Sequence, residues 1–145
     1  MAGPLRIVVD GVPVAKGRPK FTTVNGFGRS YTPAKTRIYE NWVQMCGVLA
    51  MSRAGLSTLD SPVVLEVEAV MPIPTSWSKK RQRMAAEGEI LPAKKPDLSN
   101  ITKAVEDGLN GIVFRDDSQI VRSSARKLYG SDPKVVITIT ELRSA

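Results

Sequence analysis

The residues with the clearest chemical potential lie in and just beyond the segment KPDLSNITKAVEDGLNG. This segment carries Asp97, Asn100 and Lys103, and the pair Asp116-Asp117 follows a few residues after its end. Carboxylate oxygens suit hard cations such as Mg²⁺, which retain waters and bind substrate phosphates through one or two protein carboxylates. Such a cation supplies hydroxide near neutral pH and offsets charge on a phosphodiester. Lys103 would then face the phosphate as a point charge.

The same residues also have an ordinary structural interpretation. Asp97 or Ser99 would cap a helix. The pair Asp116-Asp117 would belong to a turn, and Lys103 would be solvated. From the residue types alone, both interpretations stay open.

Composition limits the chemistry further. The chain has no histidine, which excludes Ser-His-Asp catalysis, Cys-His catalysis and histidine zinc sites, and leaves carboxylates, Lys, Tyr or metal-bound water. The 21 Lys and Arg against 14 Asp and Glu give a formal charge of +7. A polyanionic partner would match this charge through phosphate contacts, although charge alone does not separate nucleic-acid-binding proteins from other basic domains.

Length and cysteine content predict one domain, residues 1–145, in a reducing compartment. The 145 residues are enough to bury a core without disulfides. The single Cys46 lies in an apolar helical pattern, so we expect it in the core. No signal-peptide pattern and no membrane-spanning apolar run is present, so we expect a soluble, cytoplasmic protein with no membrane partner.

The hydrophobic pattern predicts the elements that must position these residues. It predicts strands over 5–14, 61–74, 119–130 and 134–142, with a turn joining the last two. Helices are expected from Thr32-Pro33 to about Gly55, over 75–89 and over 98–110. Residues 15–33 read as a basic hairpin or loop. We therefore predict an α+β fold: a single two-layer domain with a mixed β-sheet covered by helices on one face, leaving a sheet face or edge for dimerisation.

Two acidic residues on a strand could complete a metal site. Glu66 and Glu68 share one face of the strand over 61–74. A solvated strand face is the simpler interpretation, because alternating polar residues are normal on antiparallel sheets. If that face approaches Asp97, one of the two Glu residues could become a ligand.

Two basic segments could contact DNA. Lys79, Lys80 and Arg81 follow Trp77, and they would either bind phosphates or form an ordinary soluble helix surface. The segment 16–31 interleaves cations with aromatic residues, which suits backbone contacts and base stacking but also a hairpin that packs its aromatic side chains inward. Its cations are Lys16, Arg18, Lys20 and Arg29.

The segment KPDLSNITKAVEDGLNGIVFRDDSQIV resembles the signature of the RusA family of Holliday junction resolvases, which is approximately K-P-D-x-D-N-x-x-K, then D-x-L-N-G, then D-D-x-Q. VAKGRPKFT, GRSYTPAKTRIYE and MPIPTSWSKKRQRMAAEG also resemble segments of the phage and prophage branch, so the resemblance spans nearly the whole chain. It implies a homodimer that binds four-way and other branched DNA junctions. It also implies paired, Mg²⁺-dependent nicks in recombination and repair.

The resemblance implies roles for individual residues. Asp97 would be the first metal-binding acid, Lys103 the catalytic lysine and Asp117 the downstream acid. Asp116 would assist Asp117 as a metal ligand, and Mn²⁺ could replace Mg²⁺. Asn100 matches the asparagine that follows the second acid of the family, and we expect it to contact DNA.

Ser99 departs from the family pattern, which usually has Asp at this position. A serine hydroxyl is a neutral, poor Mg²⁺ ligand, so loss of this charge should weaken cation affinity. Three explanations compete: Asp116 or Glu68 substitutes for the missing acid, the protein binds junctions without efficient cleavage, or the serine is an engineered change. A basic nucleic-acid-binding module unrelated to junctions is a further alternative.

Overall fold

The structure is a computed structural model that describes residues 3–17, 20–24, 26–31 and 33–142 of the 145-residue chain. For several residues of the first hairpin, Lys20 and Arg29 among them, it describes only the backbone. In chain order the elements are β1 (Leu5–Asp10), β2 (Lys20–Val24), β3 (Phe27–Tyr31), α1 (Ala34–Ala54), β4 (Val63–Pro72), α2 (Lys79–Ala86), α3 (Leu98–Leu109), the short 3₁₀ helix η1 (Asp117–Gln119), β5 (Ile120–Gly130) and β6 (Lys134–Glu141).

Four strands form one mixed sheet in the order β1-β6-β4-β5. β4 and β5 are parallel, whereas β6 is antiparallel to both β1 and β4. β2 and β3 pair as a separate antiparallel hairpin, which confirms the predicted hairpin. A short turn joins β5 to β6, as predicted, yet the two strands do not pair with each other because β4 lies between them.

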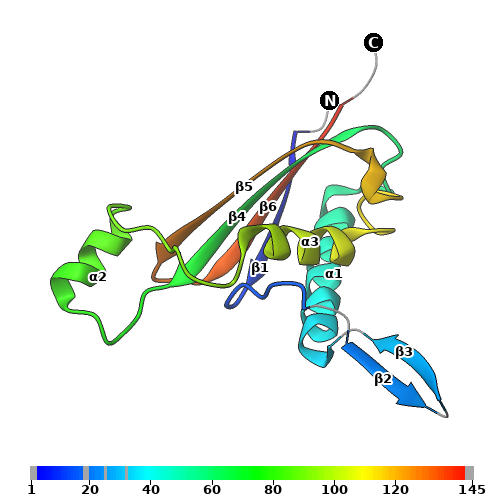
Figure 1. The fold of residues 1–145 in the computed structure, drawn as a ribbon. Coiled ribbons are helices and arrows are strands. Elements are labelled where there is room, and N and C mark those ends of the chain that lie inside the picture. The colour runs from blue at the N-terminus through cyan, green and yellow to red at the C-terminus, as the bar shows by residue number, and fades with distance from the viewer. Residues whose placement is uncertain (1–2, 18–19, 25, 32, 143–145) are drawn as a thin grey trace.

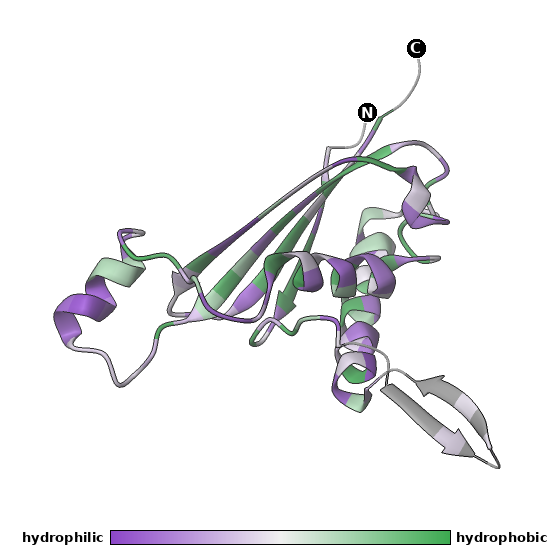
Figure 2. Cartoon of the chain, in the orientation of Figure 1, coloured by the Kyte–Doolittle hydropathy of each residue, from purple (hydrophilic) through white to green (hydrophobic). Residues whose placement is uncertain are grey.

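The core lies between one face of the sheet and two helices. Alternate residues of β4 are buried, beginning with Val63, Leu65 and Val67, and β1 and β6 show the same alternation. α1 and α3 cover this face, as Figure 1 shows, and Figure 2 shows hydrophobic residues alternating with hydrophilic ones along the strands. The predicted α+β sheet with helices on one face is therefore confirmed. α2 differs, because it projects beyond the end of the sheet.

Two glycines allow α1 and α3 to approach closely. A Cβ atom built on Gly108 would lie 2.7 Å from Cγ1 of Val43 and 3.0 Å from the carbonyl oxygen of Glu40. A Cβ atom on Gly47 would lie 2.7 Å from Cδ2 of Leu109. Side chains at these positions would separate the helices, so the glycines fix how deeply α3 is seated on α1.

The boundaries of α1 agree closely with the sequence pattern. The helix ends at Ala54, and the C-cap residue Gly55 has a φ of 65°, the left-handed conformation that glycine adopts readily. Pro33 occupies the N-cap position, and the expected cap Thr32 lies outside the described residues. Cys46 is half-buried and packs against the core, close to its expected place.

No helix in the described part of the chain is both long and apolar enough to span a membrane.

Candidate active site

The exposed side of α3 carries the residues that the sequence singled out. Ile101, Val105 and Leu109 are fully buried on the core side of this helix. Asp97 occupies the N-cap position, but its side chain makes no capping hydrogen bond. The carboxylate of Asp97 is therefore exposed and uncommitted, which argues against the interpretation of this residue as a simple helix cap. Ser99 is also exposed in the first turn.

Lys103 links α3 to the acidic segment beyond the helix. Its Nζ lies 3.4 Å from Oδ1 of Asp107 and 3.6 Å from Oδ2 of Asp117. The charge of Asp107 is the main cause that raises the pKa of Lys103 above its usual value, and Asp117 contributes in the same direction. Lys103 is therefore a fully charged ammonium at neutral pH. It lies close to Asp117, the downstream acid that was predicted to belong to the same site.

The neighbouring acids Asp116 and Asp117 have different surroundings. Oδ2 of Asp116 accepts a hydrogen bond from the backbone N–H of Ser118 at 3.0 Å and caps η1. Hydrogen bonding from the Ser118 side chain, and then from its backbone N–H, lowers the pKa of the Asp116 carboxyl. The turn interpretation thus holds for Asp116. Asp117 instead directs its carboxylate toward Lys103.

Gln119 fixes the acidic segment to the rest of the domain. Its Oε1 accepts the backbone N–H of Asp116 at 2.9 Å. Its Nε2 donates to the carbonyl oxygens of Leu59 and Ser61, each at 2.9 Å. The glutamine of the D-D-x-Q pattern therefore positions Asp116 and Asp117, a role that the sequence analysis did not assign.

Lys127 holds the segment that leads into Asp97. From β5, its Nζ donates to the carbonyl oxygens of Lys94 at 2.8 Å and Pro96 at 3.0 Å. Asp97 follows directly, so these two bonds set where its backbone enters α3. No sequence signal indicates this role, because the partners lie about thirty residues apart and nothing in the strand pattern of β5 marks Lys127.

Lys16 connects the root of the β2–β3 hairpin to the two helices. Its Nζ lies 2.7 Å from Oε2 of Glu40 and 2.8 Å from Oδ2 of Asp107, and its backbone N–H donates to the carbonyl oxygen of Asn100 at 2.9 Å. Burial alone would lower the pKa of Lys16, but the bonds to Asp107 and Glu40 outweigh it and raise the pKa. The ammonium expected to contact DNA is thus engaged by two carboxylates.

Glu106 is a further acid near Lys103, outside the residues predicted from the sequence. Burial is the main cause that raises the pKa of this carboxyl, and the charges of Asp117 and Asp107 add to it, whereas Lys103 opposes it. Glu106 follows Lys103 by three residues, a spacing that places both on one side of a helix. The three-residue spacing from Lys103 was the sequence signal that could have identified Glu106.

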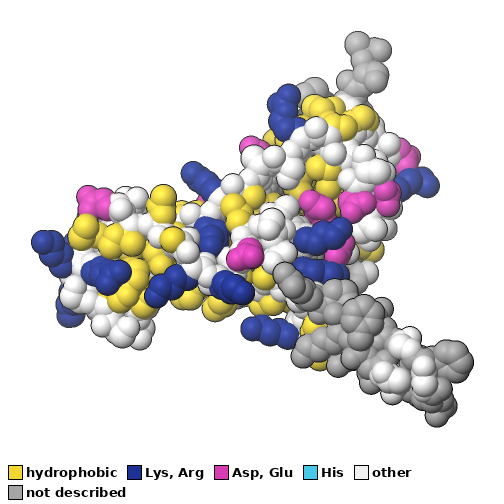
Figure 3. Space-filling model, viewed as in Figure 1, with side chains coloured by type: hydrophobic (Ala, Val, Ile, Leu, Met, Phe, Trp, Pro, Cys, Tyr) yellow, Lys and Arg dark blue, Asp and Glu magenta, His cyan; other side chains and the backbone are white. Residues whose placement is uncertain are grey.

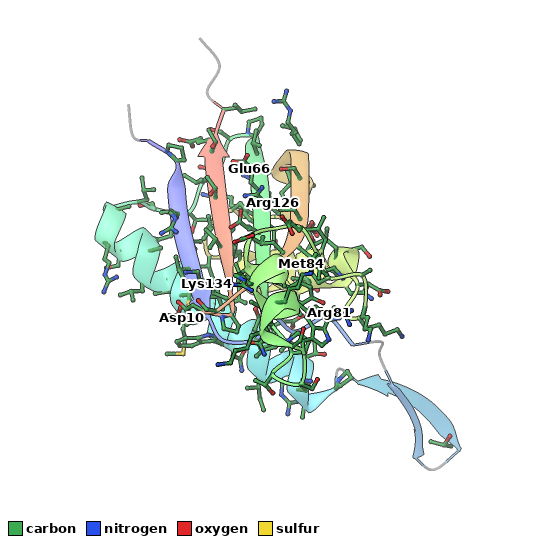
Figure 4. The ribbon with its side chains drawn as sticks, turned by 90° about the vertical axis from the view of Figure 1, so that its left-hand side faces the viewer. Asp10, Glu66, Arg81, Met84, Arg126 and Lys134 are labelled. Atoms are coloured by element: carbon green, nitrogen blue, oxygen red, sulfur yellow. The ribbon has the colours of Figure 1, made fainter. Side chains whose placement is uncertain are left out.

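Glu68 lies on the other face of the sheet. Because Val67 and Ala69 point into the core beneath the helices, the intervening Glu68 points away from α3. Its Oε2 accepts a hydrogen bond from Nε of Arg126 at 2.8 Å. Figure 4 labels Glu66 and Arg126 on the neighbouring strands β4 and β5. The structure does not bring Glu68 to Asp97, so the condition for its proposed role as a ligand is not met.

The donor atoms fit a Mg²⁺ ion only in part. Within the ranges that the structure describes, no three Asp, Glu or Cys side chains converge into a cluster that could hold a metal. Asp97 and Asp117 nevertheless offer hard oxygen donors, and Mg²⁺ is commonly held by one or two carboxylates together with waters and substrate phosphates.

The helix α2, which is basic, and the β2–β3 hairpin lie on either side of α3 (Figure 1). Lys79, Lys80 and Arg81 are exposed on α2, and the Arg81 guanidinium lies 4.0 Å from the centroid of the Trp77 ring. Trp77 in turn makes an edge contact with Tyr129 of β5 at 5.4 Å, which anchors α2 to the sheet. The β2–β3 hairpin projects on the opposite side of α3 (Figure 1).

Figure 3 shows acidic side chains gathered over α3 and η1, with Lys and Arg side chains beside them and over α2. Arg18 lies outside the described residues, and the side chains of Lys20 and Arg29 do too, so their predicted contacts with DNA stay predictions. Asn100 is exposed in the first turn of α3.

The helix α3 carries exposed carboxylates and a lysine, and it lies between the basic helix α2 and the β2–β3 hairpin. This combination indicates a protein that acts on nucleic acid. The family described as endodeoxyribonuclease RusA has a model that matches residues 10–140, and the chain belongs to this family. The chain is also similar to a protein of Bacillus subtilis (strain 168) named uncharacterized protein YqaN. The two are 34% identical over 140 residues, which cover 95% of this chain and 96% of that protein.

Proposed function

We propose that this protein is a Mg²⁺-dependent endonuclease that resolves four-way DNA junctions by paired nicks. The single observation that carries the proposal is the placement of Lys103 beside Asp117, on the helix whose N-terminus presents the uncapped Asp97. Membership of the endodeoxyribonuclease RusA family supports the same conclusion. The class of reaction is hydrolysis of a phosphodiester.

The geometry supports distinct roles for the residues of the site. Asp97 and Asp117 would hold Mg²⁺, or Mn²⁺ in its place. When bound, the ion supplies a more acidic water and neutralises charge on the phosphate. Lys103 would stabilise the charge that develops on the phosphodiester, because an ammonium is a compact point charge. Asp107 orients Lys103. Asp116 caps η1 through Oδ2, and its Oδ1 would assist Asp117 as a metal ligand.

We propose a homodimer for this activity. A four-way junction is nearly two-fold symmetric, and an isologous pair presents two identical sites to it. In each copy, α2 and the β2–β3 hairpin would grip the DNA arms that flank α3.

A nicking assay tests the proposed function. The full chain is incubated with Mg²⁺ and either a labelled four-way junction or a linear duplex of the same sequence. We expect paired nicks in the junction and little cleavage of the duplex. Binding without cleavage under every divalent metal would overturn the proposal, and equal binding of both DNAs with a steep salt dependence would indicate a general nucleic-acid-binding module.

Ser99 favours a second candidate, a protein that binds branched DNA but cleaves it weakly. This serine is exposed in the first turn of α3, where the family usually has an acid, and the described residues contain no three-acid cluster.

Ser99→Asp distinguishes the two candidates in the nicking assay. If Asp97 and Asp117 already suffice, we expect the rate to change by less than about threefold, because a further acid adds only affinity for the cation. A gain of about 100-fold or more would show that the natural site is incomplete and would favour the second candidate.

Lys127→Met tests how the segment before Asp97 is positioned. Loss of the two bonds to Lys94 and Pro96 would let the Asp97 backbone shift. We expect about tenfold more Mg²⁺ to be needed for half-maximal nicking, the usual size of effect for a residue that orients a metal ligand. A Mg²⁺ titration of the nicking rate measures this change.

Lys127→Arg and Lys134→Met serve as controls for this prediction. Arginine can still donate to both carbonyl oxygens, so Lys127→Arg should recover most of the Mg²⁺ affinity. Lys134 pairs with Asp132 at the turn before β6, 3.5 Å away, and Lys134→Met removes an equal charge elsewhere. An unchanged Mg²⁺ requirement in Lys127→Met would contradict the positioning role.

A further inference from the structure

Large apolar side chains gather on the solvent side of α1. The core side of this helix packs Tyr39, Val43 and Met51 into the domain. The other side exposes Ile38, Trp42, Met45, Val48 and Leu49. Within this group Ile38, Trp42, Met45 and Leu49 alternate steps of four and three residues, which is the spacing of the apolar seam between paired helices. A helix that is apolar on both sides is normally covered on both.

A groove of about 750 Å³ runs between this helix and the edge of the sheet. Cys46, Leu49 and Arg53 line it from α1, and β1 lines it from the other side. Within the described chain β1 pairs with β6 alone, so its outer edge is open. Trp42 closes one end, where its Nε1 donates to the carbonyl oxygen of Asp10 at 3.0 Å. In Figure 4, α1 extends past the β1 edge, beside the labelled Asp10.

We propose that a second copy of this chain docks on α1 and the β1 edge, in a two-fold arrangement. An isologous interface must be complementary to itself, and this surface carries both a ridge, the exposed apolar side chains of α1, and a hollow next to it. The open edge of β1 could pair with the same edge of the second copy. The placement rests on the dimer of the proposed function.

Nucleic acid is a poor occupant of the apolar seam itself, and Arg6 and Arg53 lie in the adjoining groove rather than in the seam. The four seam residues Ile38, Trp42, Met45 and Leu49 carry no charge, whereas phosphate contacts need cations. The exposed cations of α2 and the acids of α3 lie elsewhere, so a dimer formed through α1 would leave the candidate active site open to DNA.

The area of the patch fits one side of a dimer interface. Exposed fractions run from 41% for Trp42 to 67% for Ile38. With roughly 200 Å² for a large side chain, the exposed apolar surface of α1 amounts to about 500 Å², near the upper end for a monomeric protein. A stable dimer buries about 800 Å² on each partner. The β1 edge and Val12, which is 53% exposed, would add to the area.

Sedimentation equilibrium of the full chain tests the proposal. We expect the natural protein to be a dimer and Leu49→Glu to raise the dimer dissociation constant by about 100-fold or more, because the two-fold axis would bury two unpaired carboxylates. Leu91→Glu is the matched control, since Leu91 is 61% exposed outside the patch and should leave the dissociation constant unchanged. Ile38→Glu is a second variant at the far end of the seam.

Two results would overturn the proposal. One is a natural protein that stays monomeric at about 100 μM, a concentration at which even a weak specific dimer assembles. The other is an unchanged dimer dissociation constant in folded Leu49→Glu and Ile38→Glu, with folding verified by circular dichroism. If the natural protein is a dimer that nicks junctions, and both folded variants keep the dimer, the interface is wrong and the proposed function stands. If both variants lose the dimer but the natural protein does not nick junctions, the interface is supported and the proposed function is rejected.

Discussion

Asp97→Asn should abolish junction nicking, with a loss of about 1000-fold in rate, equivalent to about 4 kcal/mol of transition-state stabilisation. The amide keeps the size of the side chain but lacks the negative charge that would hold Mg²⁺. Junction binding should remain or become tighter, because the variant repels phosphates less. Single-turnover nicking and a gel-shift titration on the same four-way junction measure the two effects.

The stability of the domain should not change with this substitution. The Asp97 side chain makes no capping hydrogen bond, and Asn is as good a residue as Asp at a helix N-cap. The unfolding temperature should therefore stay within about 2 °C of the natural protein. Asp132→Asn, in the turn before β6, is the control for loss of a carboxylate outside the site. Nicking by Asp97→Asn at more than about a tenth of the natural rate would remove Asp97 from the site.

Lys103→Met has the second largest expected effect, a fall of about 100-fold or more in the nicking rate at saturating Mg²⁺. The variant removes the ammonium that would face the phosphate. It also removes the positive charge next to Asp117, so half-saturation should occur at a lower Mg²⁺ concentration. A slower nicking rate combined with tighter Mg²⁺ binding would show that only the charge of Lys103 was lost. If the variant instead disrupted the structure of the site, both the nicking rate and the Mg²⁺ affinity would fall. A Mg²⁺ titration of the nicking rate gives both quantities.

The pH dependence provides an independent check on Lys103. Because Asp107 and Asp117 raise its pKa above the usual value of 10.5, the ammonium stays protonated throughout the range from pH 7 to 9. Lys103 therefore predicts no fall in rate as pH rises through this range. A falling limb there that disappears in Lys103→Arg would contradict the raised pKa, since arginine remains charged at higher pH.

The local elements could be predicted from the sequence because their signals are local. The apolar stripe of Ile101, Val105 and Leu109 and the stop at Asn110-Gly111 gave α3 within a residue. The order of the strands could not be predicted in this way, because it depends on pairing between segments that are far apart in the sequence. A short turn between β5 and β6 resembles a hairpin, but only the pairing of β4 with both strands determines which strand is central.

The part of the candidate site in which both interacting residues belong to one sequence motif could be predicted. Lys103 and Asp117 belong to one signature, and the structure places them side by side. Gln119 and Lys127 could not be assigned, because each acts through backbone carbonyls of a distant segment. Glu68 could have been placed correctly. The apolar residues on the other face of its strand, which face the helices, already implied that Glu68 points away from them.

Asp107 uses both of its oxygen atoms for different parts of the molecule. Oδ2 binds Lys16 at the root of the hairpin, and Oδ1 lies next to Lys103. One carboxylate therefore sets the spacing between the arm that would hold DNA and the lysine that would act on it. A displacement of Lys16 by a bound strand would therefore be felt by Lys103 through the Asp107 carboxylate that both ammonium groups share.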